Sequence, residues 1–240
     1  MNVYLAEFFG TMLLVFMGDG VCANVLLKDS KAEGAGWIAI TIAWGIALAL
    51  CVYGFGSISG AHLNPALTIG LAAAGNFDLG LVPGYILAQV AGGFCGAAAM
   101  YLYFLPHINR TESQALKLAI FATGPAIRHT ASNFFCEVVG TFVLLYGVLV
   151  IAGANLAEGL GPLAIGALLI GIGLSLGGTT GYALNPARDL GPRIFHQIAP
   201  IKGKGGSDWA YGWIPVVAPI LGGLLAVFVR YYFVKLGITT

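Results

Sequence analysis

Long apolar stretches alternate with short polar connections along nearly the whole chain. A helix needs about 20 apolar residues to cross a hydrocarbon core of roughly 30 Å, and six stretches reach that length. They cover residues 3–26, 36–56, 82–104, 132–153, 161–180 and 213–235. Two further apolar pieces, residues 64–75 and 185–198, are too short to cross. The pattern predicts an all-α membrane protein with six transmembrane helices and two re-entrant half-helices.

Both short pieces open with the same tripeptide, in an apolar setting where a helix break is costly. Asn64-Pro65-Ala66 opens the first piece and Asn185-Pro186-Ala187 opens the second. Unpaired backbone groups in hydrocarbon each cost several kcal/mol, so we expect such a break only where it lines something polar. Two matching breaks indicate one shared polar site.

The sequence around these breaks is duplicated. Ala6-Glu7-Phe8-Phe9-Gly10-Thr11 returns as Cys136-Glu137-Val138-Val139-Gly140-Thr141, and residues 60–66 return as residues 181–187. Each half holds three expected spans, so the second half enters the membrane from the opposite side and the repeats are inverted. We expect one domain over residues 1–240, with repeat one at about 1–104, repeat two at about 132–240 and a joining loop at 105–131.

Composition narrows the class of protein. Hydrophobic residues make up 58% of the chain and charged residues only 9%, whereas an ordinary soluble domain is about 25% charged. The formal net charge of +1 offers no basic face for nucleic acid. The four cysteines stand singly in apolar stretches, which is typical of small buried side chains. We therefore expect a protein in the lipid bilayer with no nucleic-acid partner, no metal and no cofactor.

The first residues of the two half-helices predict what they do. Asn is a favoured N-cap and Pro fits the first helical position, so each helix starts at its tripeptide. The positive ends of both helix dipoles then face each other near the midplane, with the amides of Asn64 and Asn185 between them. A cation, including a hydronium ion, meets a barrier there, whereas a neutral solute with hydroxyl groups can accept hydrogen bonds as it passes. This is the electrostatics of a neutral-solute pore.

These motifs resemble those of the major intrinsic protein family, the aquaporins and aquaglyceroporins. The resemblance rests on the duplicated Asn-Pro-Ala, on the run Ser59-Gly60-Ala61-His62-Leu63-Asn64-Pro65-Ala66 and on the repeated Glu7 and Glu137. It covers essentially the whole chain. It implies an aquaporin-like inverted-repeat fold, a passive channel rather than an enzyme, a homotetramer with one pore per subunit, and a plasma-membrane location with both termini in the cytoplasm.

Within that family, the run from Asn185 to Arg193 resembles the glycerol-conducting branch, in which Asp follows the Arg. By motif position, the resemblance implies a selectivity filter formed by four residues: Trp44, Gly173, Tyr182 and Arg188. The arginine can hold two adjacent hydroxyl oxygens, the two rings give apolar faces to the carbons of a polyol, and the glycine leaves room. The branch most often has Phe where this chain has Tyr182, so passage of both glycerol and water is expected while the preference between them stays open.

Four further residues are predicted to support the half-helices: Glu7, Glu137, His62 and Asp189. Because the two glutamates repeat with the halves, we interpret them as acceptors for the unwound backbone, the alternative being the coupling carboxylates of a transporter. His62 is expected to bond locally rather than to sense pH. Asp189 is expected to position the loop around Arg188, unless it or Glu137 pairs with that arginine. Asp19, beside glycines near the end of the first span, is expected to reach the interface.

Three alternative functions stay open beside a glycerol and water channel. A water-selective aquaporin differs from it only at the filter. An ion-coupled secondary transporter also uses inverted repeats and broken helices. A membrane enzyme needs a nucleophile, an acid–base pair or a metal cluster, and the four histidines are dispersed without a ligand motif, so we expect no enzyme.

Orientation is the one point on which charge and family disagree. Basic residues concentrate in the connections at 27–35, 105–131 and 199–212, and the positive-inside rule would then place the termini outside. We follow the family, which places both termini in the cytoplasm.

Overall fold

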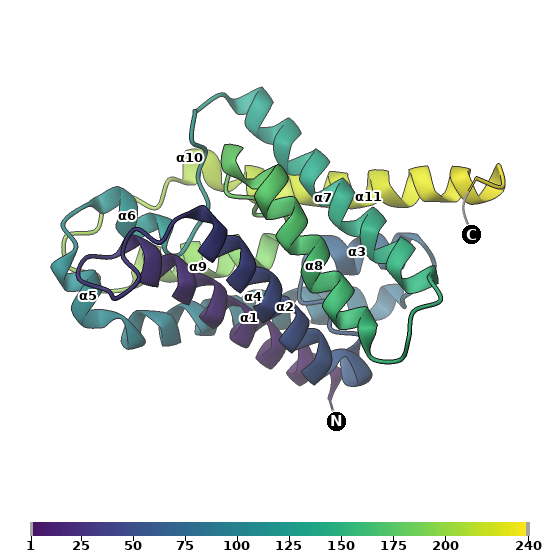
Figure 1. The fold of residues 1–240 in the computed structure, drawn as a ribbon, viewed down its shortest axis with the longest axis horizontal. Helices are drawn as coiled ribbons and strands as arrows, with labels where there is room; N and C mark the ends of the chain where they lie inside the picture. The colour runs from purple at the N-terminus through teal and green to yellow at the C-terminus, as the bar shows by residue number, and fades with distance from the viewer. Residues whose placement is uncertain (1, 239–240) are drawn as a thin grey trace.

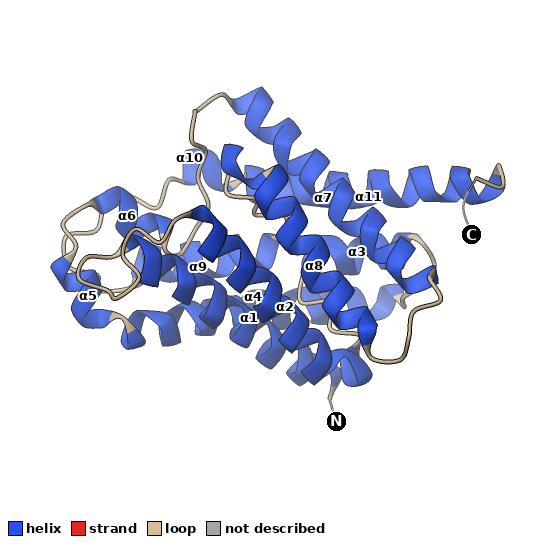
Figure 2. Ribbon diagram, viewed as in Figure 1, coloured by secondary structure: helices blue, strands red, loops and turns tan. Residues whose placement is uncertain are grey.

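The computed structural model describes residues 2–238, and every regular element in that range is a helix (Figures 1 and 2). Residue 1 and residues 239–240, the outer ends of the two expected repeats, lie outside the described residues. The elements are α1 (Val3–Leu26), α2 (Trp37–Ser59), α3 (Pro65–Ala73), η1 (Leu79–Leu81), α4 (Val82–Tyr103), α5 (Leu105–Arg110), α6 (Gln114–Ala119), α7 (Thr130–Gly153), α8 (Leu160–Ser175), η2 (Gly177–Thr179), α9 (Pro186–Ile198), α10 (Trp209–Gly212) and α11 (Ile214–Lys235).

Five helices of the described chain are long and apolar enough to cross a membrane: α1, α2, α4, α7 and α11. The span expected at 161–180 is shorter, because α8 has 16 residues and ends at Ser175. Gly177 and Gly178 follow, and glycine is a poor helix former. A helix rises about 1.5 Å per residue, so α8 alone reaches only roughly 24 Å, and the turn of η2 extends it.

The connection expected as a loop at 105–131 contains the two short helices α5 and α6. Ser113 caps α6 by accepting a hydrogen bond from the Leu116 N–H at 3.3 Å. Figure 1 shows both helices at one end of the molecule, while the two termini lie toward the other. The half-helix α9 lies nearer the α5 and α6 end and α3 lies nearer the termini (Figure 1).

The two halves pack in matching ways. Helix α1 packs against α4 as α7 packs against α11, and each half-helix lies on the last long helix of the other half, α3 on α11 and α9 on α4. A Cβ at Gly93 of α4 would lie 2.6 Å from the Ala187 carbonyl oxygen of α9, and a Cβ at Gly223 of α11 would lie 3.1 Å from the Ala66 carbonyl oxygen of α3. Glycine therefore allows the close approach that seats both half-helix starts between the long helices.

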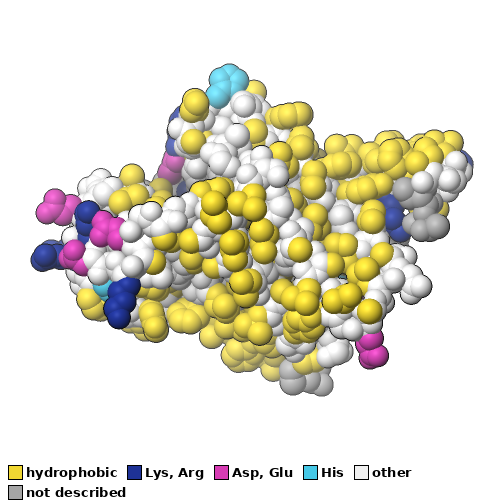
Figure 3. Space-filling view, viewed as in Figure 1, with side chains coloured by type: hydrophobic (Ala, Val, Ile, Leu, Met, Phe, Trp, Pro, Cys, Tyr) yellow, Lys and Arg dark blue, Asp and Glu magenta, His cyan; other side chains and the backbone are white. Residues whose placement is uncertain are grey.

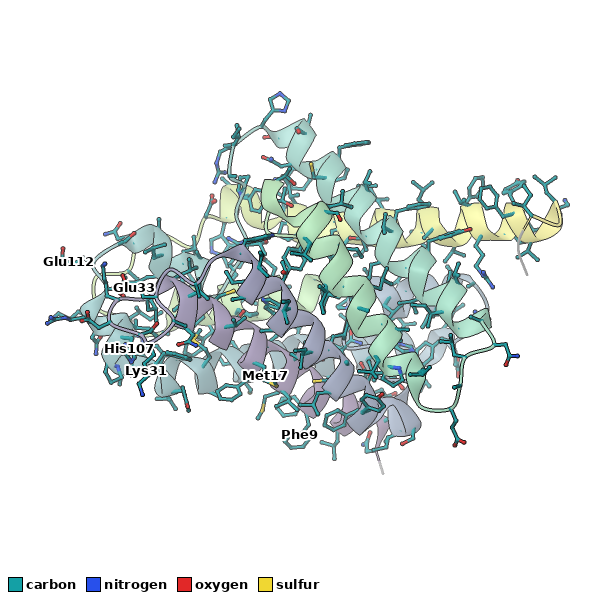
Figure 4. The ribbon with its side chains drawn as sticks, viewed as in Figure 1. Phe9, Met17, Lys31, Glu33, His107 and Glu112 are labelled. Carbon is teal, nitrogen blue, oxygen red and sulfur yellow. The ribbon has the colours of Figure 1, made fainter. Side chains whose placement is uncertain are left out.

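Apolar side chains cover the middle of the molecule, and charged side chains gather at the α5 and α6 end (Figure 3). Figure 4 shows Lys31, Glu33, His107 and Glu112 at that end, and Phe9 and Met17 along α1. Large apolar side chains such as Leu87 of α4 and Phe228 of α11 are exposed. A surface of this kind suits lipid around the middle and water at the ends, as in a multi-pass membrane protein.

Candidate functional site

Each half-helix starts at an asparagine that caps it. In Asn64-Pro65-Ala66 the asparagine Oδ1 accepts a hydrogen bond from the alanine N–H at 2.8 Å, and in Asn185-Pro186-Ala187 the same bond measures 2.9 Å. The proline stands at the first helical position, where no backbone N–H is needed. The two tripeptides thus start their helices in the same way.

The two asparagines also bond across the molecule. Asn64 Nδ2 donates to the carbonyl oxygen of Leu184 at 2.9 Å, and Asn185 Nδ2 donates to the carbonyl oxygen of Leu63 at 2.7 Å. Each half-helix start is therefore tied to the residue that precedes the other asparagine. A primary amide has two N–H donors, so each asparagine keeps one for another acceptor.

The backbone before each asparagine is left-handed at three of four residues. These are Gly60, Ala61 and Leu63 in the first half and Gly181, Tyr182 and Leu184 in the second. For a residue other than glycine this conformation costs on the order of 1–3 kcal/mol and persists only where neighbours hold it. The neighbours that hold these runs are two buried glutamates.

Glu7 accepts four hydrogen bonds from the first run and its surroundings. Its Oε1 accepts from the Ser59 hydroxyl at 2.6 Å and the His62 N–H at 2.9 Å. Its Oε2 accepts from the Leu63 N–H at 2.7 Å and from Gln89 Nε2 at 2.8 Å. The carboxylate, which is fully buried, satisfies two backbone amides of the left-handed run.

Glu137 takes the same place in the second half. Its two carboxylate oxygens accept from the N–H groups of Ala183 and Leu184, each at 3.0 Å. Both glutamates therefore accept from two consecutive backbone amides directly before the asparagine. This geometry is the one expected of structural acceptors.

A cavity of about 270 Å³ runs past both asparagines. The polar side chains in its lining are those of His62, Asn64, Tyr182, Asn185 and Arg188. The remaining lining is apolar and includes Leu14, Leu48, Val52, Leu144, Val148 and Leu169. The space is amphipathic, so it can offer hydrogen-bond partners to hydroxyl groups and an apolar surface to carbon atoms.

Three of the four expected filter residues, Trp44, Tyr182 and Arg188, line this cavity, and Gly173 does not. The Arg188 Cζ lies 4.3 Å from the centre of the Trp44 ring. A Cβ at Gly173 would lie 2.7 Å from Thr41 Cγ2 and 3.0 Å from Tyr182 Cζ. The room beside Gly173 is thus occupied by Thr41 and by the Tyr182 ring rather than open.

The ion pair of Arg188 differs from the one that the sequence left open as an alternative. Neither Asp189 nor Glu137 pairs with it. Its Nη1 lies 3.5 Å from Asp19 Oδ1 and donates to the Phe121 carbonyl oxygen at 3.4 Å. The expectation that Asp19 reaches the interface is wrong, because this residue of α1 is completely buried beside the arginine.

Asp189 binds the segment that faces Arg188. Its Oδ2 accepts from the Thr123 N–H at 2.8 Å and from the Thr123 hydroxyl at 2.6 Å. Its Oδ1 accepts from Arg193 Nε at 2.7 Å, and Arg193 in turn donates to the Thr123 and Ser207 carbonyl oxygens. This network holds the stretch around Phe121 against α9.

His62 bonds locally, with Nδ1 3.2 Å from Thr68 Oγ1, and its ring contacts Phe77 and Tyr85. It also lines the cavity. Within residues 2–238, no group of three or more His, Cys, Asp or Glu side chains is arranged to hold a metal ion.

Sequence reasoning gave no role to three polar residues that complete the site: Ser59, Gln89 and Arg193. Gln89 donates to Glu7 and, at 2.9 Å, to the Thr68 hydroxyl. The signal that could have found it is a polar side chain inside an expected membrane span, which is functional by default. The same rule singles out Arg193, which is fully buried.

The chain is similar to known proteins of one family. A model of the family described as "Major intrinsic protein" matches residues 1–231. The "Probable glycerol uptake facilitator protein" of Thermotoga maritima is 58% identical over 225 residues, which cover 94% of this chain and 96% of that protein. The "Glycerol uptake facilitator protein" of Bacillus subtilis is 55% identical over 223 residues, which cover 93% and 81%. The X-ray structure of the aquaglyceroporin from Plasmodium falciparum is similar with a TM-score of 0.83 and 32% identity, covering 94% of this chain and 93% of that one.

Proposed function

Because this chain belongs to the major intrinsic protein family, we propose that it is a passive transmembrane channel for glycerol, other small neutral polyols and water. The observation that carries the proposal is the amphipathic cavity, which passes three filter residues and both capping asparagines. Two relatives more than half identical to this chain are named glycerol uptake facilitators. In the proposal, Trp44 and Tyr182 face the carbon chain of the polyol and Arg188 donates to its hydroxyl oxygens.

Exclusion of ions and protons follows from the half-helix starts. The positive ends of α3 and α9 and the remaining N–H donors of Asn64 and Asn185 disfavour a cation at that point. A water or a polyol hydroxyl oxygen accepts from those donors instead. A water at this point has its oxygen oriented toward both amides, which breaks a chain of water molecules that could relay protons.

The proposal is tested by flux measurements on purified protein in liposomes. We expect stopped-flow light scattering to report both glycerol and water permeability well above protein-free liposomes. Leu48 lines the cavity and Leu50 of the same helix is exposed. Leu48→Trp should therefore reduce glycerol permeability more than tenfold, while Leu50→Trp should stay within twofold of wild type.

Two results would replace the proposal by its alternatives. Water permeability without glycerol permeability would indicate a water-selective aquaporin. Glycerol permeability that disappears when the proton gradient is removed would indicate an ion-coupled transporter.

We further propose that the chain is one channel domain of two inverted repeats, assembled as a homotetramer in the plasma membrane with both termini in the cytoplasm. The orientation rests on the family resemblance and stands against the basic residues of the connections. Five of those seven residues have partners in the structure: Lys28 pairs with Glu33, Arg110 with Asp29 and Arg128 with Asp208, while Lys117 and Lys204 donate to backbone carbonyls. Protease access to a C-terminal tag in intact cells tests the orientation, and light scattering of the purified protein tests the tetramer.

A further inference from the structure

Two charged residues near the filter have apolar counterparts in the other half of the chain. When the halves are aligned on their shared Glu and Asn-Pro-Ala motifs, Asp19 corresponds to Leu149 and Arg188 corresponds to Leu67. Leu149 is buried in a hydrophobic cluster against which Leu67 packs. Each half-helix thus meets a long helix of the other half at corresponding positions, with apolar packing between α3 and the α7 cluster and an ion pair between α9 and α1.

Asp19 is buried without the hydrogen bonds that a buried carboxylate normally receives. Its side chain is fully buried, and neither oxygen has a hydrogen-bond partner among the described residues. It is not among the residues that line the cavity. Its ion-pair partner is Arg188, at 3.5 Å. A charged side chain at this depth is costly unless it is paired, so the contact with Arg188 accounts for its presence.

Arg188 needs such a partner because of where it stands. It lies in the first turn of α9, where the helix dipole disfavours a cation. Its other contacts are the Phe121 carbonyl oxygen at 3.4 Å and the face of the Trp44 ring. Asp19 alone among these three partners carries a formal negative charge.

We propose that Asp19 is a positioning residue that determines specificity: it holds the Arg188 guanidinium at the wall of the cavity and makes the filter an ion pair rather than a lone cation. This inference rests on the proposed channel function, because it concerns the same passage. Asp19 does not touch the solute and acts through Arg188.

The geometry explains how the pair sets selectivity. A guanidinium has five N–H donors. Its Nη1 lies 3.5 Å from Asp19 and donates to the Phe121 carbonyl oxygen, and neither of these residues lines the cavity. The other donors are left for hydroxyl oxygens. Without the carboxylate, the guanidinium is free to lean into the passage, which narrows it more for a three-carbon polyol than for water.

The first test compares permeability ratios in liposomes. Asp19→Asn keeps the shape and removes the charge, and we expect it to lower the glycerol-to-water permeability ratio at least threefold. Asp19→Glu keeps the charge and should give a ratio closer to wild type than Asp19→Asn does. Asp78→Asn, at an exposed position, is the matched control. A merely structural role for Asp19 would lower glycerol and water permeability together and leave their ratio unchanged. A glycerol-to-water ratio in Asp19→Asn that equals or exceeds that of the control therefore overturns the proposal.

The second test measures coupling between the two side chains and needs no transport. The other half of the chain supplies the replacements, so we compare Asp19→Leu, Arg188→Leu and the double variant by thermal unfolding. Each single variant leaves one buried charge unpaired and should lower the apparent Tm, and the double variant should lose less than the sum of the two. Losses that add, or single variants that leave the Tm unchanged, overturn the pairing. Absence of glycerol flux in the wild type would instead contradict the proposed function. The comparison of the single and double variants by Tm would still show whether Asp19 and Arg188 interact.

Discussion

Replacing Glu7 by Gln tests whether the buried glutamates hold the left-handed runs. The carboxylate accepts two hydrogen bonds on each oxygen, and the substitution turns one oxygen into an NH₂ donor. If the new NH₂ faces Ser59 and His62, the hydroxyl can reverse its role but the His62 N–H cannot. If the new NH₂ faces Leu63 and Gln89, the Gln89 side chain can turn its unpartnered Oε1 toward it as an acceptor. The Leu63 N–H can only donate, so it still loses its acceptor.

In either orientation one buried backbone amide loses its acceptor. An unsatisfied buried group costs about 1–3 kcal/mol, and the remaining bonds weaken because charge-assisted bonds are roughly twice as strong as neutral ones. Together these effects predict a loss of about 2–4 kcal/mol in the free energy of unfolding. For a chain of this size, each kcal/mol lowers the Tm by about 2–4 °C, which gives a drop of roughly 4–16 °C.

The assay is thermal unfolding of the purified protein, followed by glycerol flux at a temperature where both proteins are folded. Glu137→Gln should behave similarly, since Glu137 also accepts from two backbone amides. Glu158→Gln, on an exposed connection, is the control. A Tm and a glycerol permeability for Glu7→Gln that match those of Glu158→Gln would refute the structural role.

Two further substitutions probe the filter and the helix packing. Tyr182→Phe removes a buried hydroxyl that has no hydrogen-bond partner among the described residues. We therefore expect the Tm to be unchanged or higher and the glycerol-to-water permeability ratio to stay within twofold of wild type. A larger change in this ratio would mean that the hydroxyl contacts the solute. Gly93→Ala places a Cβ 2.6 Å from the Ala187 carbonyl oxygen and should destabilise the protein by about 1–3 kcal/mol. The control is Gly54→Ala, whose Cβ would have no neighbouring atom within 4 Å and should not destabilise the protein. Equal melting temperatures for the two variants would contradict the close approach of α4 and α9.

The sequence predicted the helical membrane fold and the family, and both predictions are confirmed. The helix limits came out within a few residues because strong local signals mark them, such as the Asn-Pro pairs before α3 and α9. The exception is α8, where the apolar run continues past Ser175 but the glycine pair ends the helix. A hydropathy profile alone does not show this end of α8.

Contacts between the halves could not be predicted, since they depend on how the halves meet. Asp19 looked like an interfacial residue because its partner, Arg188, stands in the other repeat and no local pattern links the two. Gly173 looked like open space because the side chains that occupy it, Thr41 and Tyr182, come from distant parts of the sequence. The buried network of Arg193 was missed because its carbonyl acceptors, Thr123 and Ser207, lie in the connections on either side of it, which carry no periodic pattern.

The crossed hydrogen bonds of the two asparagines constrain the order in which the chain can reach its final form. Asn64 donates to a carbonyl oxygen 120 residues later in the chain, and a ribosome adds about 5–20 residues per second. Roughly 6–24 s therefore separate the synthesis of the donor from that of its acceptor. During this interval the Asn64 amide lacks this acceptor, although α3 is already capped by the local bond from the Ala66 N–H to Asn64 Oδ1. The cavity also lacks residues 181–185 and Arg188, so a nascent or truncated chain that holds only the first half cannot complete the cavity wall by itself.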